Sequence, residues 1–323
     1  MRMLITILIV LALTAPLAAR GQGGAGRAGQ PGQASLPPLT LAPDLFVRAS
    51  RALDERDWDR ALLDFSLFLL LNPTYSQGYF GRGLTYLGLE QEEAALADFE
   101  AALATAPLDA GAYRASIHRL RGDIHSNARR FEAALADYDA VIELAPNAEA
   151  FANRALMHLA LADHESARAD LTRAIELEAG LAPLYLYRAY VNIELERWAD
   201  AADDYFAYIT TNEARRIRAE RPLISEQLQF IELQRGTVHE FRFEGRRGQI
   251  ATFVAQRRPS DSVDPLLVLL GPDGRAIAAD DDSAGDMNAA VRLTLPFDGA
   301  YTLLVSHSLG GSTGAVAVGV LVE

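Results

Sequence analysis

Cysteine and lysine are absent from this chain of 323 residues, and tryptophan occurs only twice. Without cysteine, the chain cannot form disulfides, thiolate metal sites, a thiol nucleophile or a lipid-modified N-terminal cysteine. The 30 basic residues, all arginine, face 43 acidic ones, so the formal net charge is -13. Binding to a nucleic-acid backbone needs clustered cations. We therefore expect no nucleic-acid partner.

Signatures of catalysis are also missing from the sequence. It contains no phosphate-binding Gly-Lys loop and no His-Glu-x-x-His zinc helix. Four histidines, His118, His125, His158 and His164, lack the spacing of a zinc helix, which needs two ligands at i and i+4 plus a third. We interpret them as packing residues rather than metal ligands, and we predict that the chain is not an enzyme.

The N-terminus has the pattern of a secretory signal peptide. A basic head at residues 1–3 precedes an apolar run over residues 4–13 and small residues up to Ala19. The run is short for a membrane span of about 20 residues, and Pro16 interrupts it. We predict a signal peptide over residues 1–19, cleaved near Ala19 or Gly21, and hence a periplasmic or secreted protein without a stable membrane span. An uncleaved anchor is the alternative.

Residues 20–41 are rich in Gly, Gln and Pro, and we predict that they form a flexible linker. A helical repeat begins after them. In each unit an Ala is followed four positions later by an aromatic residue or Leu, and another small residue lies twelve positions before the Ala. Small residues at these two positions let paired helices approach closely. The pairs are Ala61/Phe65, Ala95/Phe99, Ala134/Tyr138, Ala167/Leu171 and Ala201/Tyr205.

The boundaries of the helices follow from the same register. Pro73, Pro107 and Pro146 stand twelve positions after the Ala of the first three units, where proline ends a helix. Five extra residues between Pro107 and His118 indicate either a longer loop or an extended first helix in the third unit.

These residues resemble the tetratricopeptide repeat family over about residues 42–213. The second unit, with Gly83, Ala95, Phe99 and Pro107, matches the family best. The resemblance implies an α-helical solenoid of five tetratricopeptide-like hairpins, which holds other proteins on an extended concave surface. We assign it to residues 42–221 and expect the Arg- and Glu-rich segment 212–221 to form a terminal helix.

Arginine and aspartate keep one register through all five units, with each Asp sixteen residues after its Arg. Residues at this separation can face each other across a helical hairpin, and the planar guanidinium suits a carboxylate. We predict a row of structural Arg–Asp pairs; a groove for anionic ligands is the alternative. The pairs are Arg48/Asp64, Arg82/Asp98, Arg121/Asp137, Arg154/Asp170 and Arg188/Asp204.

The inner wall of such a solenoid is lined by side chains of the first helices. In this chain that set is mostly apolar and aromatic, which suits an extended peptide or an amphipathic helix. The alternative is that these residues pack against neighbouring repeats. The candidates for a partner-binding groove are Phe46, Phe80, Leu84, Arg119, Asp123, Leu156, Leu186 and Tyr190.

From about residue 222 the helical period gives way to alternation of apolar and polar residues. Several short segments of this kind, separated by turns, predict an all-β antiparallel sandwich over residues 222–323. The expected strands are 227–233, 238–243, 250–255, 266–270, 289–295, 301–305 and 315–322.

This region is similar to the bacterial pre-peptidase C-terminal domain family. The similarity rests on short motifs such as Phe241-x-Phe243, Gly248-Gln249, Asp264-Pro265-Leu266-Leu267, Pro272-Asp273-Gly274 and Asp298-Gly299-x-Tyr301. It implies an extracytoplasmic accessory module and not a peptidase, because no hydrolase precedes it.

A cluster of acidic residues in this region offers the oxygen ligands that Ca²⁺ prefers, although its spacing differs from an EF-hand loop. A solvated acidic turn is the alternative. The candidate calcium ligands are Asp264, Asp280, Asp281, Asp282 and Asp286.

Together these patterns predict an exported scaffold that binds protein or peptide segments in the helical groove, with a cell-envelope component as a possible second partner. The alternative is a cell-surface or carbohydrate-binding module that the repeats present. A glycan platform would expose Trp or Tyr side chains, whereas the sandwich region contains no Trp.

Overall fold

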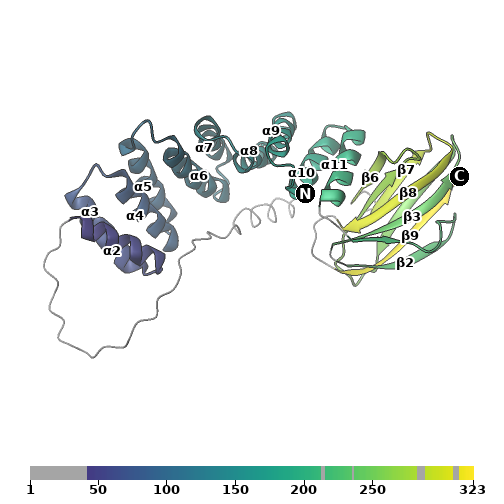
Figure 1. Ribbon diagram of the computed structural model, residues 1–323, viewed down its shortest axis with the longest axis horizontal. Helices are drawn as coiled ribbons and strands as arrows, with labels where there is room; N and C mark the ends of the chain where they lie inside the picture. Colours follow the sequence, from purple (N-terminus) through teal and green to yellow (C-terminus); the bar gives the residue numbers. More distant parts are fainter. Residues whose placement is uncertain (1–41, 212–214, 235, 282–287, 308–312) are drawn as a thin grey trace, which may run out of the picture. The chain divides into compact units, whose positions relative to one another are not determined.

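The computed structural model describes residues 42–211, 215–234, 236–281, 288–307 and 313–323. Within these ranges ten helices, α2 to α11, precede nine strands, β1 to β9 (Figure 1). Residues 1–41, with the predicted signal peptide and linker, lie outside the described residues. The chain divides into two compact units, of which the first ends at Pro146 and the second begins at Asn147.

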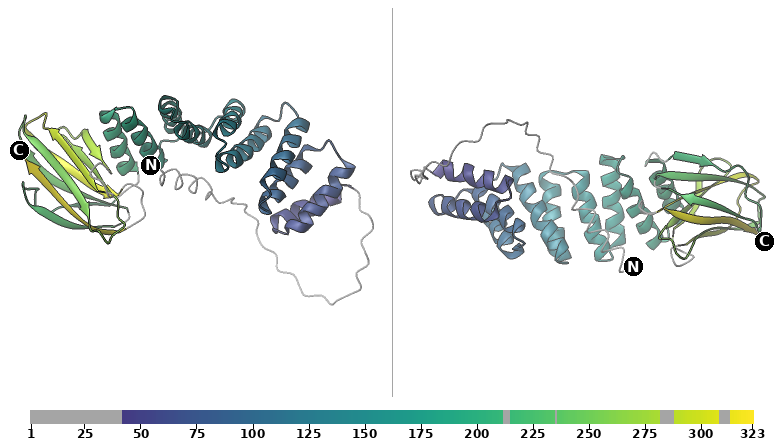
Figure 2. Two further views of the ribbon diagram at one scale, coloured as in Figure 1. Left: turned by 180° about the vertical axis from the view of Figure 1, so that it is seen from behind. Right: turned by 90° about the horizontal axis from the view of Figure 1, so that it is seen from below.

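The first unit consists of three antiparallel helical hairpins, which can be followed in Figures 1 and 2. Helix α6 has 17 residues where α2 and α4 have 13, so the extra residues of the third repeat extend its first helix. Each predicted stop proline stands two positions beyond the end of a second helix, as expected. The hairpins are α2 (Ala42–Asp54) with α3 (Trp58–Leu71), α4 (Ser76–Gly88) with α5 (Glu92–Thr105), and α6 (Gly111–Asn127) with α7 (Phe131–Leu144).

The small residues of the repeat lie where the two helices of a hairpin touch. Ala61, Ala95 and Ala134 are fully buried. A methyl group added at Gly83 would stand 2.7 Å from the ring of Phe99, closer than real Cβ atoms come. The two small residues that recur in each repeat therefore mark the place where its paired helices touch.

The turn within each hairpin ends the first helix in the same way in all five repeats. One residue adopts a positive φ of 56–60°. The N–H of the next residue donates to the carbonyl five positions back, for example Asp57 to Ala52 at 2.8 Å. This is the Schellman motif, in which glycine normally takes the left-handed position. Here the left-handed residues are Arg56, Glu90, Arg129, Ala162 and Glu196.

Because a Cβ is strained at positive φ, Ala162→Gly is expected to raise the free energy of unfolding by about 0.5–1 kcal/mol. Urea denaturation followed by circular dichroism measures the change. The matched control is Ala97→Gly, at an exposed position inside α5, which should lose about 1 kcal/mol. Equal destabilisation by the two substitutions would contradict a strained turn.

The second unit contains two further hairpins and all nine described strands. The hairpins are α8 (Ala148–Ala160) with α9 (His164–Leu177) and α10 (Ala182–Glu194) with α11 (Trp198–Thr211). The strands are β1 (Arg215–Arg218), β2 (Leu228–Leu233), β3 (Thr237–Gly245), β4 (Ile250–Arg257), β5 (Pro265–Leu270), β6 (Ala276–Asp280), β7 (Ala289–Thr294), β8 (Gly299–His307) and β9 (Gly314–Val322).

The strands form two sheets, one in the order β1-β3-β8-β5-β6 and one in the order β2-β9-β4-β7. All described pairs are antiparallel except β1 with β3. The inward-facing residues of both sheets, including Phe241, Phe253 and Leu303, form one buried core. The seven expected strands are all present, and β1 and β6 are additional.

The expected terminal helix is wrong. Residues 215–218 form strand β1, which pairs in parallel with β3, Arg215 opposite Thr237. A helix over 212–221 would offer only Ala214, Ile217 and Ala219 as apolar residues, too few for a packed face, and packing supplies most helical stability in proteins. The edge of the sheet instead gives this segment hydrogen-bond partners.

The last hairpin and the five-stranded sheet share a hydrophobic core. Figure 1 shows α11 beside strand β6 of this sheet. Tyr205, Tyr208 and Ile209 of α11 belong to the same buried cluster as Val268 and Leu304 of the sheet. Strand β5 is consequently buried on both faces, which explains why its sequence PLLVLL is apolar throughout instead of alternating. The sandwich thus covers the end of the helical array, which repeat arrays otherwise protect with a polar capping repeat.

Candidate functional site

The five predicted Arg–Asp pairs are confirmed, each between the two helices of one hairpin. The shortest nitrogen–oxygen distances are 2.6–2.7 Å. All five aspartates are buried, at 0–5% exposure, while 20–40% of each arginine side chain remains exposed. The carboxylates therefore lie inside the hairpins and the guanidinium groups lie over them.

In four of the five pairs the arginine uses both Nε and Nη2. Arg82, for example, donates from Nε to Asp98 Oδ2 at 2.7 Å and from Nη2 to Oδ1 at 2.8 Å. Arg121, Arg154 and Arg188 bind their carboxylates in the same two-pronged way. Since these forks are already occupied by carboxylates of the chain, the geometry favours a structural role over an anion-binding groove.

Burial changes the energy of these pairs. An ion pair that is exposed to solvent contributes about 0–1 kcal/mol to the free energy of unfolding. A buried carboxylate that loses its partner costs about 3–5 kcal/mol. Removing one partner of an Arg–Asp pair should therefore destabilise the hairpin more than breaking an exposed ion pair would.

In three of the repeats the residue four positions after the arginine also lies near the buried carboxylate. Asn192 donates from Nδ2 to Asp204 Oδ2 at 2.9 Å. His125 Nε2 lies 3.9 Å from Asp137 Oδ2, and His158 Nε2 lies 3.8 Å from Asp170 Oδ2. These histidines thus lie beside the ion pairs, as packing residues would.

Asp137 has the most crowded surroundings of the five aspartates. His118 Nδ1 lies 2.8 Å from its Oδ1, and Arg121 binds both oxygens. Burial by itself would raise the pKa of Asp137, but the hydrogen bonds from His118 and Arg121 outweigh it and lower the pKa. Burial and the charge of Arg130 lower the pKa of His125. Within the described ranges, no three His, Asp or Glu side chains converge as metal ligands would.

The predicted groove residues of the first unit lie partly in its core. Phe46 packs against the rings of Phe65, Phe68 and Tyr75, with centroids 5.2–5.9 Å apart. Phe80 contacts the rings of Phe99 and Tyr113, and Leu84 borders the same cluster. Arg119 forms an ion pair with Asp123 at 3.0 Å, and Tyr138 Oη donates to Asp123.

In the second unit the predicted groove residues differ in exposure. Leu186 is only 7% exposed, because it packs into the core shared with the sheet. It therefore has little surface to offer a partner. Leu156 and Tyr190 are half-buried, and burial together with the charge of Glu194 raises the pKa of Tyr190. Partner binding by the groove residues stays a prediction.

Sequence reasoning missed an apolar stripe on α3. Leu63, Leu67 and Leu70 recur at helical spacing, with exposures of 58%, 42% and 78%, and Leu71 adds 62%. The available signal was the near-continuous apolar stretch of this helix, LLDFSLFLLL, which leaves too few polar residues to cover an outer face. This stripe is a further candidate surface for a protein partner.

The predicted calcium ligands are only partly described. Asp264 directly precedes β5, and Asp280 ends β6, where its Oδ2 accepts a hydrogen bond from the N–H of Ala290 at 2.7 Å. Asp281 follows in a half-buried position, whereas Asp282 and Asp286 lie outside the described residues. Calcium binding stays a prediction.

None of the helices in the described ranges combines the length and apolar character needed to cross a bilayer. Three segments, residues 76–107, 115–147 and 148–180, match the tetratricopeptide repeat family. No curated protein matches the chain.

Several solved structures are similar to about half of the chain. MamA from Desulfovibrio magneticus RS-1, solved from residue 41 to its end, is 16% identical, with a TM-score of 0.47, over 53% of this chain and 93% of the solved chain. YrrB, a TPR protein with an unusual peptide-binding site, is 19% identical, with a TM-score of 0.47, over 53% of this chain and 86% of YrrB. The pilF protein of Pseudomonas aeruginosa is 14% identical, with a TM-score of 0.43, over 53% and 76% of the two chains.

Proposed function

We propose that these tetratricopeptide-like repeats form a protein-interaction scaffold that binds protein or peptide segments along its first helices. The observation that carries the proposal is the pairing of charges inside the hairpins. Because each repeat arginine binds an aspartate of its own hairpin, the first helices leave mainly apolar and aromatic side chains for a partner. Leu84, Leu156 and Tyr190 remain half-exposed there, as anchors for a bound segment require.

We propose further that the protein acts outside the cytoplasm. Support comes from the sequence of residues 1–19 and from the similarity of residues 225–323 to pre-peptidase C-terminal domains. In this proposal the sandwich has two roles, to cover the last hairpin and to contact a cell-envelope component, and the chain has no enzymatic activity.

Site-specific photocrosslinking in the protein's own cell tests the groove. A photoreactive phenylalanine analogue replaces Leu84 or Tyr190, and mass spectrometry identifies the crosslinked proteins. We expect a protein partner from each position, at least about fivefold above two exposed control positions, Ala97 of α5 and Arg173 of α9. Equal crosslinking from groove and control positions would contradict a partner held along the first helices.

A further inference from the structure

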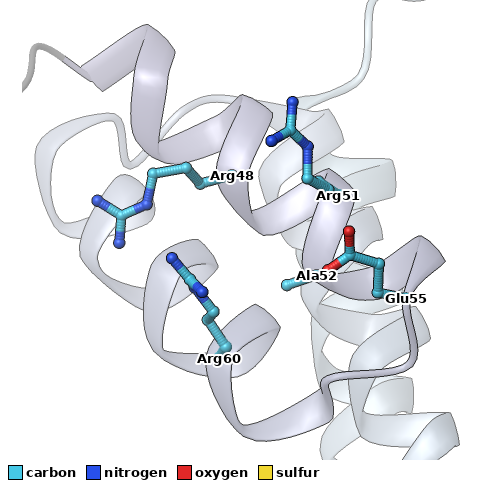
Figure 3. Close-up of a pocket in the computed structure, with 5 residues that line it drawn as sticks. All are labelled: Arg48, Arg51, Ala52, Glu55 and Arg60. Atoms are coloured by element: carbon cyan, nitrogen blue, oxygen red, sulfur yellow. The ribbon is translucent and has the colours of Figure 1, made fainter. Parts of the chain in front are cut away.

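A hollow of about 200 Å³ lies beside the turn of the first hairpin (Figure 3). It is lined by Arg48, Arg51, Ala52 and Glu55 of α2 with its following turn, and by Arg60 of α3. Figure 3 shows the guanidinium ends of Arg48 and Arg60 on one side of the hollow and the Glu55 carboxylate on the other. Three cations therefore surround a space large enough for a small ligand.

The hollow exists because the first repeat has a small residue where the other repeats have a large one. The position four residues after the repeat arginine is Ala52 here and Tyr86, His125, His158 and Asn192 in the other repeats. In the fifth repeat the larger side chain binds the buried carboxylate directly, as Asn192 does. The side chain of Ala52 ends at its Cβ and cannot bind the buried carboxylate, so the space that a larger side chain would occupy stays open.

Arg48 is also incompletely bonded. Its Nη2 donates to Asp64 Oδ1 at 2.7 Å. Its Nε is buried and has no hydrogen-bond partner among the described residues, whereas the Nε of each of the other four repeat arginines donates to an aspartate. Asp64 Oδ2 likewise accepts no hydrogen bond there, and Arg60 Nε lies 4.0 Å from it. A buried N–H without an acceptor costs about 1–3 kcal/mol, so Arg48 is held less completely than the other four repeat arginines.

The charges around the hollow select the kind of acceptor. Arg48, Arg51 and Arg60 contribute three positive charges, against the two negative charges of Glu55 and Asp64. Planar guanidinium forks bind the paired oxygens of carboxylates and phosphates. We propose that the hollow binds a small oxyanion, a carboxylate or phosphate group, between Arg48 and Arg60, with Arg51 as a further cation.

Two variants remove the site in different ways. Ala52→Tyr fills the hollow with the residue that the second repeat carries at this position. The double variant Arg51→Gln, Arg60→Gln removes two exposed cations and leaves the Arg48–Asp64 pair intact. Arg173→Gln is the control, since Arg173 is an equally exposed helix arginine in a pair with Glu176. Circular dichroism confirms that each variant is folded.

Isothermal titration of the full chain at low ionic strength uses inorganic phosphate in one arm and N-acetylalanine in another, with uncharged N-acetylalaninamide as the blank. We expect saturable binding of one oxyanion, weakened by at least about tenfold in both hollow variants and changed by less than about twofold in Arg173→Gln. Binding of N-acetylalanine would identify the ligand group as a carboxylate, and binding of inorganic phosphate would identify it as a phosphate. Absence of saturable binding in both arms, or affinity that folded hollow variants retain, would overturn the proposal.

Discussion

Arg82→Met is expected to lower the free energy of unfolding by about 3–5 kcal/mol, because it leaves Asp98 buried without a counter-charge. The methionine keeps most of the apolar stem, so the loss reports the guanidinium and not packing. The side chain of Asp98 is 7% exposed, and both of its carboxylate oxygens are bound by Arg82. Urea denaturation followed by the helical circular dichroism signal measures the change.

Two further variants separate this effect from simple loss of charge. Arg173→Met removes an arginine from an exposed pair with Glu176 and should cost less than about 1 kcal/mol. Arg82→Met combined with Asp98→Leu should recover most of the lost stability, because an apolar pair can replace a buried ion pair at little cost. If Arg82→Met costs no more than Arg173→Met, the buried pairs do not hold the hairpins together.

A charge placed between the last hairpin and the sheet is expected to be as damaging. Val268 of β5 is fully buried in the core that α11 shares with the five-stranded sheet. Val268→Asp would bury a carboxylate among apolar side chains, and we expect a loss of about 4 kcal/mol or more. Hydrogen exchange should show lost protection in α10 and α11 as well as in β5.

Val254→Asp is the matched control, since Val254 is a half-exposed strand residue of the other sheet. It should change stability by less than about 1 kcal/mol, as surface substitutions usually do. If Val268→Asp leaves the protection of α10 and α11 unchanged, the sandwich does not stabilise the repeats and is merely attached to them.

Much of the fold was predictable because its signals are local and repeated. The Ala and Gly positions recur at contacts between paired helices, and one register places Arg and Asp sixteen residues apart in every hairpin. The alternation in the C-terminal region located seven strands. In each case a period in the sequence corresponds to the period of a helix, a strand or a repeat in the structure.

What escaped prediction depends on contacts between elements that are distant in sequence. Residues 215–218 form a strand because β3 offers them an edge, which their own composition does not reveal. The all-apolar sequence of β5 could not indicate that one of its faces meets α11. Leu186 belonged by register to the inner wall, yet that same contact buries it.

The Arg-lined hollow is a further feature that could not be predicted from the sequence. Ala52 is visible in the sequence as the one small residue at its repeat position. Its consequence is the open space beside Arg48, and only the packing of α2 against α3 defines that space. Where a residue recurs at the same position of every repeat, the sequence predicts the contact that it makes. Where one repeat has a different residue, as at Ala52, the sequence predicts only that this contact is lost.

The contact between the last hairpin and the sheet also restricts how the protein can evolve. Repeat arrays change length by duplication, and each new hairpin must dock on its neighbours. A hairpin inserted after Thr211 would separate α11 from Val268 and Leu304 and expose both surfaces. One inserted before Ala182 would leave that contact intact. New repeats in related chains should therefore be found upstream of α10, with the hairpin that meets the sheet retained.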